Sequence, residues 1–322
     1  MTDTPARHLP VMAVEVVALL GSAPGHILAD LTVGAGGHAG VFLRATAPTG
    51  RVLASDRDTV ALDLARERLA EFGDRVTYTH ADWVSALERL ADDGVEPDAI
   101  LMDLGVSSMQ LDEPERGFSL REDGPLDMRM DQSGGPTAAD FLNTAKETEL
   151  ETALAAWGEE PHAAKIARAI AKRRRERPFR TTGDLRTLVE TALGRRFGRI
   201  HPATRTFQAV RMAVNREMAL LEAAVPAAIE RLAPGGRLAI LSFHSGEDRV
   251  VKHLFREAAR ESGELLTKKP ARATREERAK NRRSRSARLR VYRKAGGTND
   301  HDQGSQDTGQ VQGDRRGGRA QT

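Results

Sequence analysis

Short apolar runs separated by helical patterns fill the first third of the chain. Apolar positions at helical spacing come first, at 10–20, and similar patterns at 38–44 and 59–71 lie between the runs. The runs themselves predict β-strands at 27–33, 51–55, 76–80 and 98–103. Strands that alternate with helices form a parallel sheet with helices on both faces. The pattern therefore predicts a doubly wound α/β sheet.

The pattern changes near Pro114, where a loop-like stretch gives way to helical periodicity without an evident strand. The predicted helices lie at 137–143, 147–157, 161–177 and 182–193. We interpret this region, 114–199, as a helical domain inserted into the sheet domain. The sheet domain is then discontinuous and consists of 1–113 and 200–294.

The sheet resumes after residue 200. A long helix is expected from the His201–Arg211 stretch to about Leu232, followed by a strand at 237–244. Alternating apolar and polar residues at 287–292 predict an edge strand. Residues 295–322 are rich in Gly, Gln, Asp and Arg and have almost no apolar residue to bury, so a disordered tail is predicted there.

The first strand leads into a turn that contains Gly34, Gly36 and Gly37. Glycine accepts backbone angles that other residues resist, and it lets a ligand lie against the backbone. The second strand ends at Asp56, twenty residues after Gly36, where an acid accepts hydrogen bonds from ribose hydroxyls. Residues 34–39 also satisfy the G-x-G-x-x-G/A pattern. The spacing predicts an adenosine-type cofactor, and both S-adenosylmethionine and NAD fit it.

Three further residues lie just beyond strand ends, where an open sheet forms its ligand crevice. Trp83 follows the third strand, Asp103 ends the fourth, and His244 ends the strand at 237–244. Each residue type also has an ordinary structural use: core packing for tryptophan, capping of a turn for aspartate, and positioning for histidine. The stretch after Asp103 is rich in small and polar residues, which leaves room for a flat base.

The net charge of +3 is unevenly distributed. Residues 165–180 contain eight basic residues and one acid, and residues 268–294 contain thirteen basic residues and two acids. The first of these stretches predicts a helix with one cationic face, and it includes the unbroken run Lys172, Arg173 and Arg174. A solvated helix face has a similar composition, but charge this localised favours a nucleic-acid partner.

The composition excludes several classes of protein. There is no cysteine, which excludes disulfides, thiolate metal sites and cysteine nucleophiles and agrees with a reducing cytoplasm. No apolar run approaches the length that spans a bilayer, and Glu15 interrupts the apolar stretch near the N-terminus. A cytoplasmic protein with two domains and no membrane segment is predicted.

Several long stretches resemble the RsmH (MraW) family, S-adenosylmethionine-dependent methyltransferases that act on a cytidine of bacterial small-subunit ribosomal RNA. The resemblance covers nearly the whole chain before the predicted tail. Three residues depart from the family pattern, namely Leu31, Met109 and Gly246, and they affect loop shape more than chemistry. The matching stretches are 36–38, 55–58, 103–108, 116–119, 124–131, 201–211 and 283–291.

The resemblance implies a Rossmann-like methyltransferase sheet with an inserted helical domain that recognises RNA. It also implies S-adenosylmethionine as the cofactor and methylation of the exocyclic N4 amine of a cytidine in small-subunit (16S) ribosomal RNA or the small subunit. The implied cofactor-binding residues are Gly36, Gly37 and His38 near the methionine part, Asp56 on the ribose, Trp83 beside the adenine, and Asp103 and Gln110 closing the site. The RNA would contact Lys172, Arg173 and Arg174.

Methyl transfer from a sulfonium is an in-line displacement with an activated leaving group, so alignment and electrostatics suffice and no metal is expected. The acceptor is the harder partner, because the exocyclic nitrogen of cytosine shares its lone pair with the ring. Asp103 is the predicted catalytic residue. Hydrogen-bond acceptors such as Asp103 and Ser107 can bind the N–H groups of the amine and orient its lone pair toward the methyl group. His244 is a candidate to receive the lost proton. The cytidine must leave any stack to enter the site.

Three other functions share part of the pattern. An NAD-dependent oxidoreductase would use the same glycine turn, but the basic insertion does not favour it. A non-enzymatic RNA-binding ribosome assembly factor would keep the fold without needing Asp56, Asp103 and Gln110. A DNA amino-methyltransferase shares the chemistry but has a Pro-Pro-aromatic sequence after the fourth strand, which this chain lacks.

Overall fold

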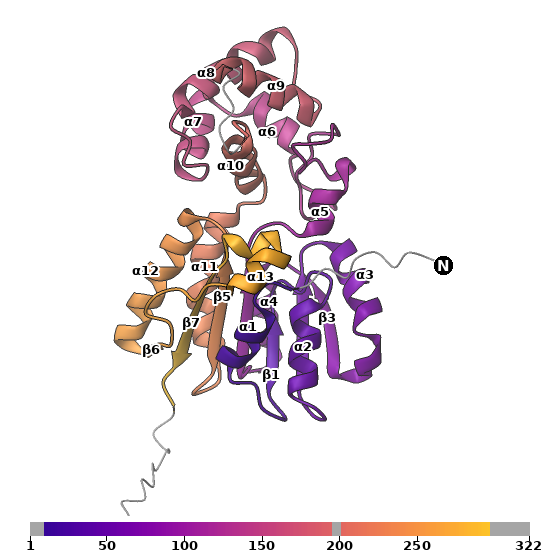
Figure 1. Ribbon diagram of the computed structural model, residues 1–322, viewed down its shortest axis with the longest axis vertical. Helices are drawn as coiled ribbons and strands as arrows, with labels where there is room; N and C mark the ends of the chain where they lie inside the picture. The colour runs from indigo at the N-terminus through magenta and orange to yellow at the C-terminus, as the bar shows by residue number, and fades with distance from the viewer. Residues whose placement is uncertain (1–9, 195–200, 297–322) are drawn as a thin grey trace, which may run out of the picture.

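The computed structural model describes residues 10–194 and 201–296, and its centre is one seven-stranded sheet (Figure 1). The strand order is β3-β2-β1-β4-β5-β7-β6. Strands β1 to β5 pair in parallel, and β7 is antiparallel to both of its neighbours. The strands are β1 (Ile27–Asp30), β2 (Arg51–Asp56), β3 (Val76–His80), β4 (Ala99–Asp103), β5 (Arg237–Ser242), β6 (Gly263–Leu265) and β7 (Arg288–Lys294).

Helices cover both faces of this sheet, which confirms the predicted doubly wound α/β class. Residues of α1, α2 and α3 pack in one hydrophobic cluster, and residues of α4, α11 and α12 pack in a second. Neighbouring strand residues divide between the two, as Ile100 and Leu101 do. Burial on both faces explains why the strands are continuous apolar runs. The helices are α1 (Ala13–Leu20), α2 (Gly37–Ala45), α3 (Thr59–Arg68), α4 (Trp83–Asp92), α11 (Glu217–Arg231) and α12 (Ser245–Glu261).

A helical body lies beyond one end of the sheet (Figure 1). It has a hydrophobic cluster of its own, to which the loop residues Phe118, Leu126 and Met128 also contribute. Phe207 and Val210 of α10 belong to that cluster, although they follow the domain boundary predicted at 199, and the boundary itself stays a prediction. The helices of this body are α6 (Ala138–Thr144), α7 (Glu147–Ala156), α8 (Ala163–Glu176), α9 (Thr182–Leu193) and α10 (Thr204–Val214).

Aspartates start the helices that follow β2 and β3. The side chain of Asp58 accepts from the backbone N–H of Val60 at the start of α3, and Asp82 accepts from Val84 and Ser85 at the start of α4. Each such cap stabilises a helix by about 1 kcal/mol. The caps fix where the chain turns away from the carboxyl edge of the sheet.

Two strand boundaries differ from the prediction. The first strand ends at Asp30 rather than at residue 33, because the Asp30 side chain accepts from the backbone N–H of Thr32 (3.1 Å) and starts the turn early. The strand predicted at 237–244 ends at Ser242, since His244 is the N-cap of α12.

Two further predictions about elements are wrong. The long helix expected up to about Leu232 is two helices, α10 and α11, separated at Asn215 and Arg216, and Arg216 has a left-handed backbone conformation (φ 50°). The expected edge strand is internal, because β7 lies between β5 and β6 and Leu289 and Val291 are fully buried.

Two remaining predictions concern membrane-spanning segments and the C-terminal tail. Among the residues that the structure describes, no helix is both long and apolar enough to cross a membrane. From residue 297 onward, the predicted tail lies outside the described residues.

Candidate cofactor pocket and active site

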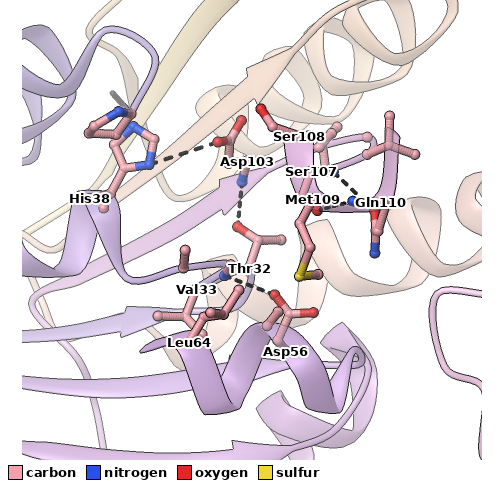
Figure 2. Close-up of a pocket in the computed structure, with 18 of the residues that line it drawn as sticks. Thr32, Val33, His38, Asp56, Leu64, Asp103, Ser107, Ser108, Met109 and Gln110 are labelled. Atoms are coloured by element: carbon pink, nitrogen blue, oxygen red, sulfur yellow. Dashed lines mark hydrogen bonds and ion pairs between the residues drawn. The ribbon is translucent and has the colours of Figure 1, made fainter. Parts of the chain in front are cut away.

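A pocket lies at the carboxyl ends of β1, β2 and β4, the edge at which open α/β sheets bind ligands. Its wall combines the glycine turn, the starts of α2 and α4, and the segment 103–110 (Figure 2). Met130 and Arg283 reach it from distant parts of the sequence. The predicted cofactor-binding residues that line it are Gly37, His38, Asp56, Trp83, Asp103 and Gln110.

The glycine turn is held by packing as well as by backbone geometry. Gly36 has φ 76°, and a Cβ there would lie 2.9 Å from the side chain of Leu69. A Cβ on Gly37 would lie 3.0 Å from Pro10. The backbone N–H of Gly34 donates to Oδ2 of Asp56 (2.9 Å), which ties the turn to the end of β2.

Asp56 lies in the pocket wall, and each of its carboxylate oxygens accepts a hydrogen bond from a backbone N–H group. Oδ2 accepts from Gly34, and Oδ1 accepts from the backbone N–H of Asp58 (2.9 Å). Burial raises the pKa of Asp56 to about 6, against these hydrogen bonds, which lower it. Each carboxylate oxygen has a second lone pair, so Asp56 can still accept from hydroxyl groups of a ligand.

Thr32 and Val33 lie between Asp103 and Asp56 (Figure 2). Its backbone N–H donates to the Thr32 hydroxyl (2.7 Å), and its Oδ2 lies 3.8 Å from Nδ1 of His38. Its Oδ1 is buried and has no hydrogen-bond partner among the described residues. Burial raises the pKa of Asp103, whereas the positive charges of His38 and Arg283 lower it. A buried acceptor without a partner, in a pocket wall, is suited to a ligand donor.

The imidazole of His38 is oriented by the chain segment before α1. Its Nε2 lies 2.8 Å from the carbonyl oxygen of Val11, so this nitrogen carries the proton and donates. The other nitrogen faces Asp103. His38 therefore links α2 to the acid at the end of β4.

Trp83 and Gln110 have structural roles beside their place in the pocket. Trp83 is the first residue of α4, and it packs in the second hydrophobic cluster while lining the pocket. The Gln110 amide donates to Asp58 Oδ2 (2.8 Å), and its oxygen accepts from the backbone N–H of Ser107 (3.0 Å). Its side chain therefore fixes α5 (Ser108–Asp112) against the start of α3.

Asp30 is a residue that the sequence reasoning missed. It ends β1, as Asp56 and Asp103 end their strands, but Leu31 and Val33 continue the apolar pattern, so the sequence placed Asp30 inside the strand. The side chain is almost fully buried, its Oδ2 has no partner among the described residues, and burial raises its pKa to about 7. Asp56 and Asp103, the two acids in the pocket wall, favour a cationic ligand, and S-adenosylmethionine has both a sulfonium and an ammonium group. The residues present therefore fit this cofactor.

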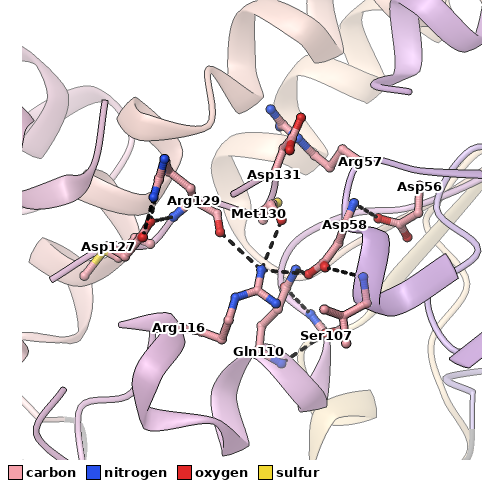
Figure 3. Close-up of polar contacts among 12 residues, drawn as sticks. Asp56, Arg57, Asp58, Ser107, Gln110, Arg116, Asp127, Arg129, Met130 and Asp131 are labelled. Atoms are coloured by element: carbon pink, nitrogen blue, oxygen red, sulfur yellow. Dashed lines mark hydrogen bonds and ion pairs between the residues drawn. The ribbon is translucent and has the colours of Figure 1, made fainter. Parts of the chain in front are cut away.

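A buried ion pair joins the sheet to the loop that leads into the helical body (Figure 3). Arg116 donates to Oδ2 of Asp58 (2.8 Å), and both side chains are at most 5% exposed. The same guanidinium donates to the backbone carbonyls of Arg129 and Met130. Asp58 thus caps α3 and accepts hydrogen bonds from both Gln110 and Arg116, and its backbone N–H donates to Asp56.

Asn215 fixes the same loop from the other side. Its amide oxygen accepts from the backbone N–H of Met130 (2.8 Å), and its amide nitrogen donates to the carbonyl of Met128 (2.7 Å). Arg57 in turn donates to the backbone carbonyl of Asn215. Met130 is thereby held in the pocket wall. The stretches 116–119 and 124–131 contain the loop residues that make these contacts to Asp58 and Asn215.

The three residues predicted to bind RNA do not share one environment. Arg173 pairs with Asp184 and stacks on Phe179, with 4.2 Å from its guanidinium carbon to the ring centre. Arg174 donates to the backbone carbonyls of Leu142 and Ala145. Lys172 is the one of the three with an exposed side chain. Periodicity placed the run on α8 but could not show these internal contacts.

His244 lies outside the pocket wall. As the N-cap of α12 it accepts from the backbone N–H of Glu247, and its Nε2 lies 2.8 Å from Oε1 of the same residue. Its geometry is that of a positioning residue. Within residues 10–194 and 201–296, no group of three or more His, Asp or Glu side chains is arranged to hold a metal ion.

Fold and pocket together define a class of protein. The sheet order with one reversed strand, and a pocket at its carboxyl edge with aspartates at the ends of β2 and β4, are those of a Rossmann-like methyltransferase that uses S-adenosylmethionine. The chain belongs to the MraW methylase family, whose model matches residues 5–295.

Curated relatives agree with this family over most of their length. The chain is 44% identical over 307 residues to a ribosomal RNA small subunit methyltransferase H from Geobacter sp. (strain M21), covering 89% of this chain and 98% of the relative. It is 47% identical over 293 residues to the protein of the same name from Sorangium cellulosum, covering 90% and 92%. The resemblance seen in the sequence is confirmed.

Proposed function

We propose that this protein transfers a methyl group from S-adenosylmethionine to the exocyclic N4 amine of a cytidine in small-subunit (16S) ribosomal RNA. The relatives at 44% and 47% identity are named for methylation of that RNA. The observation that supports the chemistry best is Asp103, a carboxylate in the wall of the cofactor pocket whose Oδ1 has no hydrogen-bond partner among the described residues. We also assign the protein to the cytoplasm, where the small subunit is assembled.

The cofactor-binding roles follow from the positions of the side chains. Gly36, Gly37 and His38 lie at the start of α2 and would hold the methionine part. Asp56 would accept from the ribose hydroxyls, and Trp83 would pack beside the adenine. When bound, S-adenosylmethionine supplies a methyl group activated by its sulfonium.

Asp103 would act on the acceptor. Its carboxylate, which is 27% exposed, can accept from an N–H of the cytosine amine and turn the nitrogen lone pair toward the methyl group. Its negative charge also stabilises the positive charge that develops on that nitrogen. Thr32 holds the backbone of Asp103, and His38 lies beside Oδ2 of its carboxylate. Gly105 and Ser107 beside it leave room for a flat base.

The helical body would recognise the RNA. The side chains of Lys165, Arg168, Lys172 and Arg175 are exposed along α8. Because Arg173 and Arg174 are bound within the chain, we assign the phosphate contacts to this exposed face, of which Lys172 is a member. The target base would leave its stack to reach the pocket.

Two alternatives fit the pocket less well. NAD has a pyrophosphate with two negative charges, and the carboxylates of Asp56 and Asp103 in the pocket wall disfavour an anion beside them. A non-enzymatic assembly factor would have no use for an unsatisfied carboxylate in the pocket wall.

The test is mass-spectrometric analysis of small-subunit RNA after incubation with the protein and S-adenosylmethionine, as free RNA and as assembled subunits. We expect one cytidine to gain a methyl group on N4 only when cofactor and protein are both present. Binding of RNA without any methylation would identify an assembly factor, and tight binding of NAD in place of S-adenosylmethionine would identify an oxidoreductase.

A further inference from the structure

The segment 268–288 forms a second strongly basic surface, separate from the helical body. It contains α13 (Arg275–Lys280) and a 3-10 turn at Arg282–Arg285. Most of its basic side chains are exposed, and Glu276 and Glu277 are its two acids. The exposed basic residues are Lys268, Lys269, Arg272, Arg275, Arg278, Lys280, Arg282 and Arg285.

This segment is fastened to the mouth of the cofactor pocket. Arg283 lines the pocket and donates to the Ser108 hydroxyl (2.6 Å) and to the backbone carbonyl of Val106. The Glu277 carboxylate accepts from the backbone N–H of Met12 (2.8 Å), just before α1. Figure 1 shows α13 at the same end of the sheet as α5 and the helical body. A substrate in the pocket would therefore lie close to these charges.

Positive charge within the segment is not balanced by the acids nearby. The pKa of Arg272 is lowered by burial and then by the charge of Arg288, with smaller contributions from Arg278 and Arg290; the charge of Asp248 raises it, but the net effect is a lower pKa. The nearby acid, Asp248, is bound by Arg290 through two hydrogen bonds (2.7 and 3.2 Å). Arg288 lies 4.0 Å from the same carboxylate.

One guanidinium nitrogen in this cluster lacks a partner. Nη1 of Arg288 is buried and has no hydrogen-bond partner among the described residues. Arg272 uses one nitrogen on the backbone carbonyls of Ser286 and Ala287, which leaves its other donors available. Neighbouring guanidinium groups, of which Arg272 and Arg278 are exposed, form the arrangement that a phosphate satisfies, because it offers charge and several acceptors together.

We propose that Arg272, Arg278 and Arg288 form a binding site for a backbone phosphate of the RNA, beside the nucleotide that enters the cofactor pocket. The inference rests on the proposed function, because it assumes an RNA substrate. The site lies on the sheet domain, so the RNA would be held at the pocket mouth independently of α8. Arg283 would connect the bound backbone to the loop that flanks Asp103.

The test measures binding of purified small-subunit RNA as a function of salt concentration. Variant Arg272→Gln/Arg278→Gln should bind the RNA at least about tenfold more weakly than wild type, and its slope of log affinity against log salt should fall by about 1.4 to 1.8, for two lost contacts. Arg272→Lys should keep most of the affinity. Arg256→Gln/Arg260→Gln, on the exposed surface of α12, removes the same charge and should change affinity less than about twofold.

Cofactor titrations and thermal unfolding of each variant check that the pocket and the fold are intact. Unchanged RNA affinity and slope in Arg272→Gln/Arg278→Gln would overturn the inference, as would an equal loss in the α12 control. Strong competition by inorganic phosphate at concentrations far below those of the salt series would assign the site to a free anion and would also overturn it. If wild type neither binds nor methylates the RNA, the proposed function itself fails.

Discussion

Asp30, Asp56 and Asp103 end three adjacent parallel strands; Asp56 and Asp103 line the pocket, whereas Asp30 is almost fully buried. Each carboxylate has a raised pKa for which burial is the largest cause. A charged carboxylate in such surroundings is unfavourable until a cation or several hydrogen-bond donors arrive. In the proposed cofactor complex, Asp56 and Asp103 would therefore contribute to the binding of S-adenosylmethionine.

Asp56→Ala should weaken binding of S-adenosylmethionine. Two charge-assisted hydrogen bonds to ribose hydroxyls would be lost, at a cost on the order of 2–4 kcal/mol. Isothermal calorimetry measures this directly, with Asp63→Ala on the exposed side of α3 as the control. Equal affinities of Asp56→Ala and wild type would remove Asp56 from the cofactor site.

The ligand-free protein should become more stable as the pH falls toward 5, through Asp30. Its pKa of about 7 in the folded state lies above the unfolded value of 3.8, so the folded state binds more protons between these values. Compared with Asp30→Asn, wild type should gain about 2 kcal/mol in free energy of unfolding from about pH 8 to about pH 5. Denaturant unfolding at several pH values measures the difference, and parallel curves for the two proteins would contradict the buried, uncharged Asp30.

At the level of single residues, the sequence predicts the side chains that are marked by the residues next to them. Asp56 and Asp103 were predicted because each follows an apolar run, and both line the pocket. It could not show that the Gln110 amide is engaged by Asp58, or that Arg174 is bound to backbone carbonyls of the α6 end. Those contacts join segments about thirty or more residues apart in the sequence, and the periodicity of a single segment cannot predict them.

Among the secondary-structure elements, the loop 114–131 connects the cofactor pocket to the helical body. The Asp58–Arg116 pair attaches it to α3, and Asn215 attaches it to the end of α10. Both partners of the ion pair are buried, so removing one leaves an uncompensated charge. Met130 of this loop lines the pocket, so the loop contacts both the helical body and the pocket wall.

Arg116→Ala should therefore destabilise the protein by about 3–5 kcal/mol, the usual cost of leaving a buried partner charge unpaired. The matched control is Arg121→Ala, an exposed arginine in the same loop, which should change stability by less than about 0.5 kcal/mol. Urea unfolding at neutral pH compares the two. Similar midpoints for Arg116→Ala and wild type would show that the buried pair contributes nothing.

The elements that the sequence predicted poorly were decided by tertiary contacts. Residues 204–231 have a continuous helical pattern without glycine, yet the helix breaks at Asn215, whose side chain binds the loop at Met128 and Met130. The alternation at 287–292 suggested an edge strand, but β6 pairs with the far side of β7. A three-residue strand such as β6 gives too short a pattern to predict.

For the whole molecule, the cofactor pocket and the two basic regions occupy different parts of the structure. The exposed face of α8 is part of the helical body, whereas 268–288 is attached to the sheet at the pocket mouth. The carboxylates of Asp56 and Asp103 in the pocket wall suit the cofactor cation, and the basic regions suit the RNA backbone. The near-neutral net charge of +3 conceals this division.

Neutralising the exposed face of α8, as Lys165→Gln/Lys172→Gln/Arg175→Gln, should weaken RNA binding and lower its salt dependence without changing cofactor affinity. Each lost phosphate contact should reduce the slope of log affinity against log salt by about 0.7 to 0.9. A filter-binding salt titration gives the slope. If it does not change, this face is a solvated surface and the RNA is recognised elsewhere.

In the proposed mechanism, Asp103 acts on the acceptor amine. The most direct measurement is single-turnover methylation of small subunits by Asp103→Asn, beside a titration of the same variant with S-adenosylmethionine. Loss of the negative charge should lower the methylation rate by about a hundredfold or more, while cofactor affinity changes much less. A near-normal rate, or a defect explained entirely by weaker cofactor binding, would contradict a role for Asp103 beyond holding the cofactor.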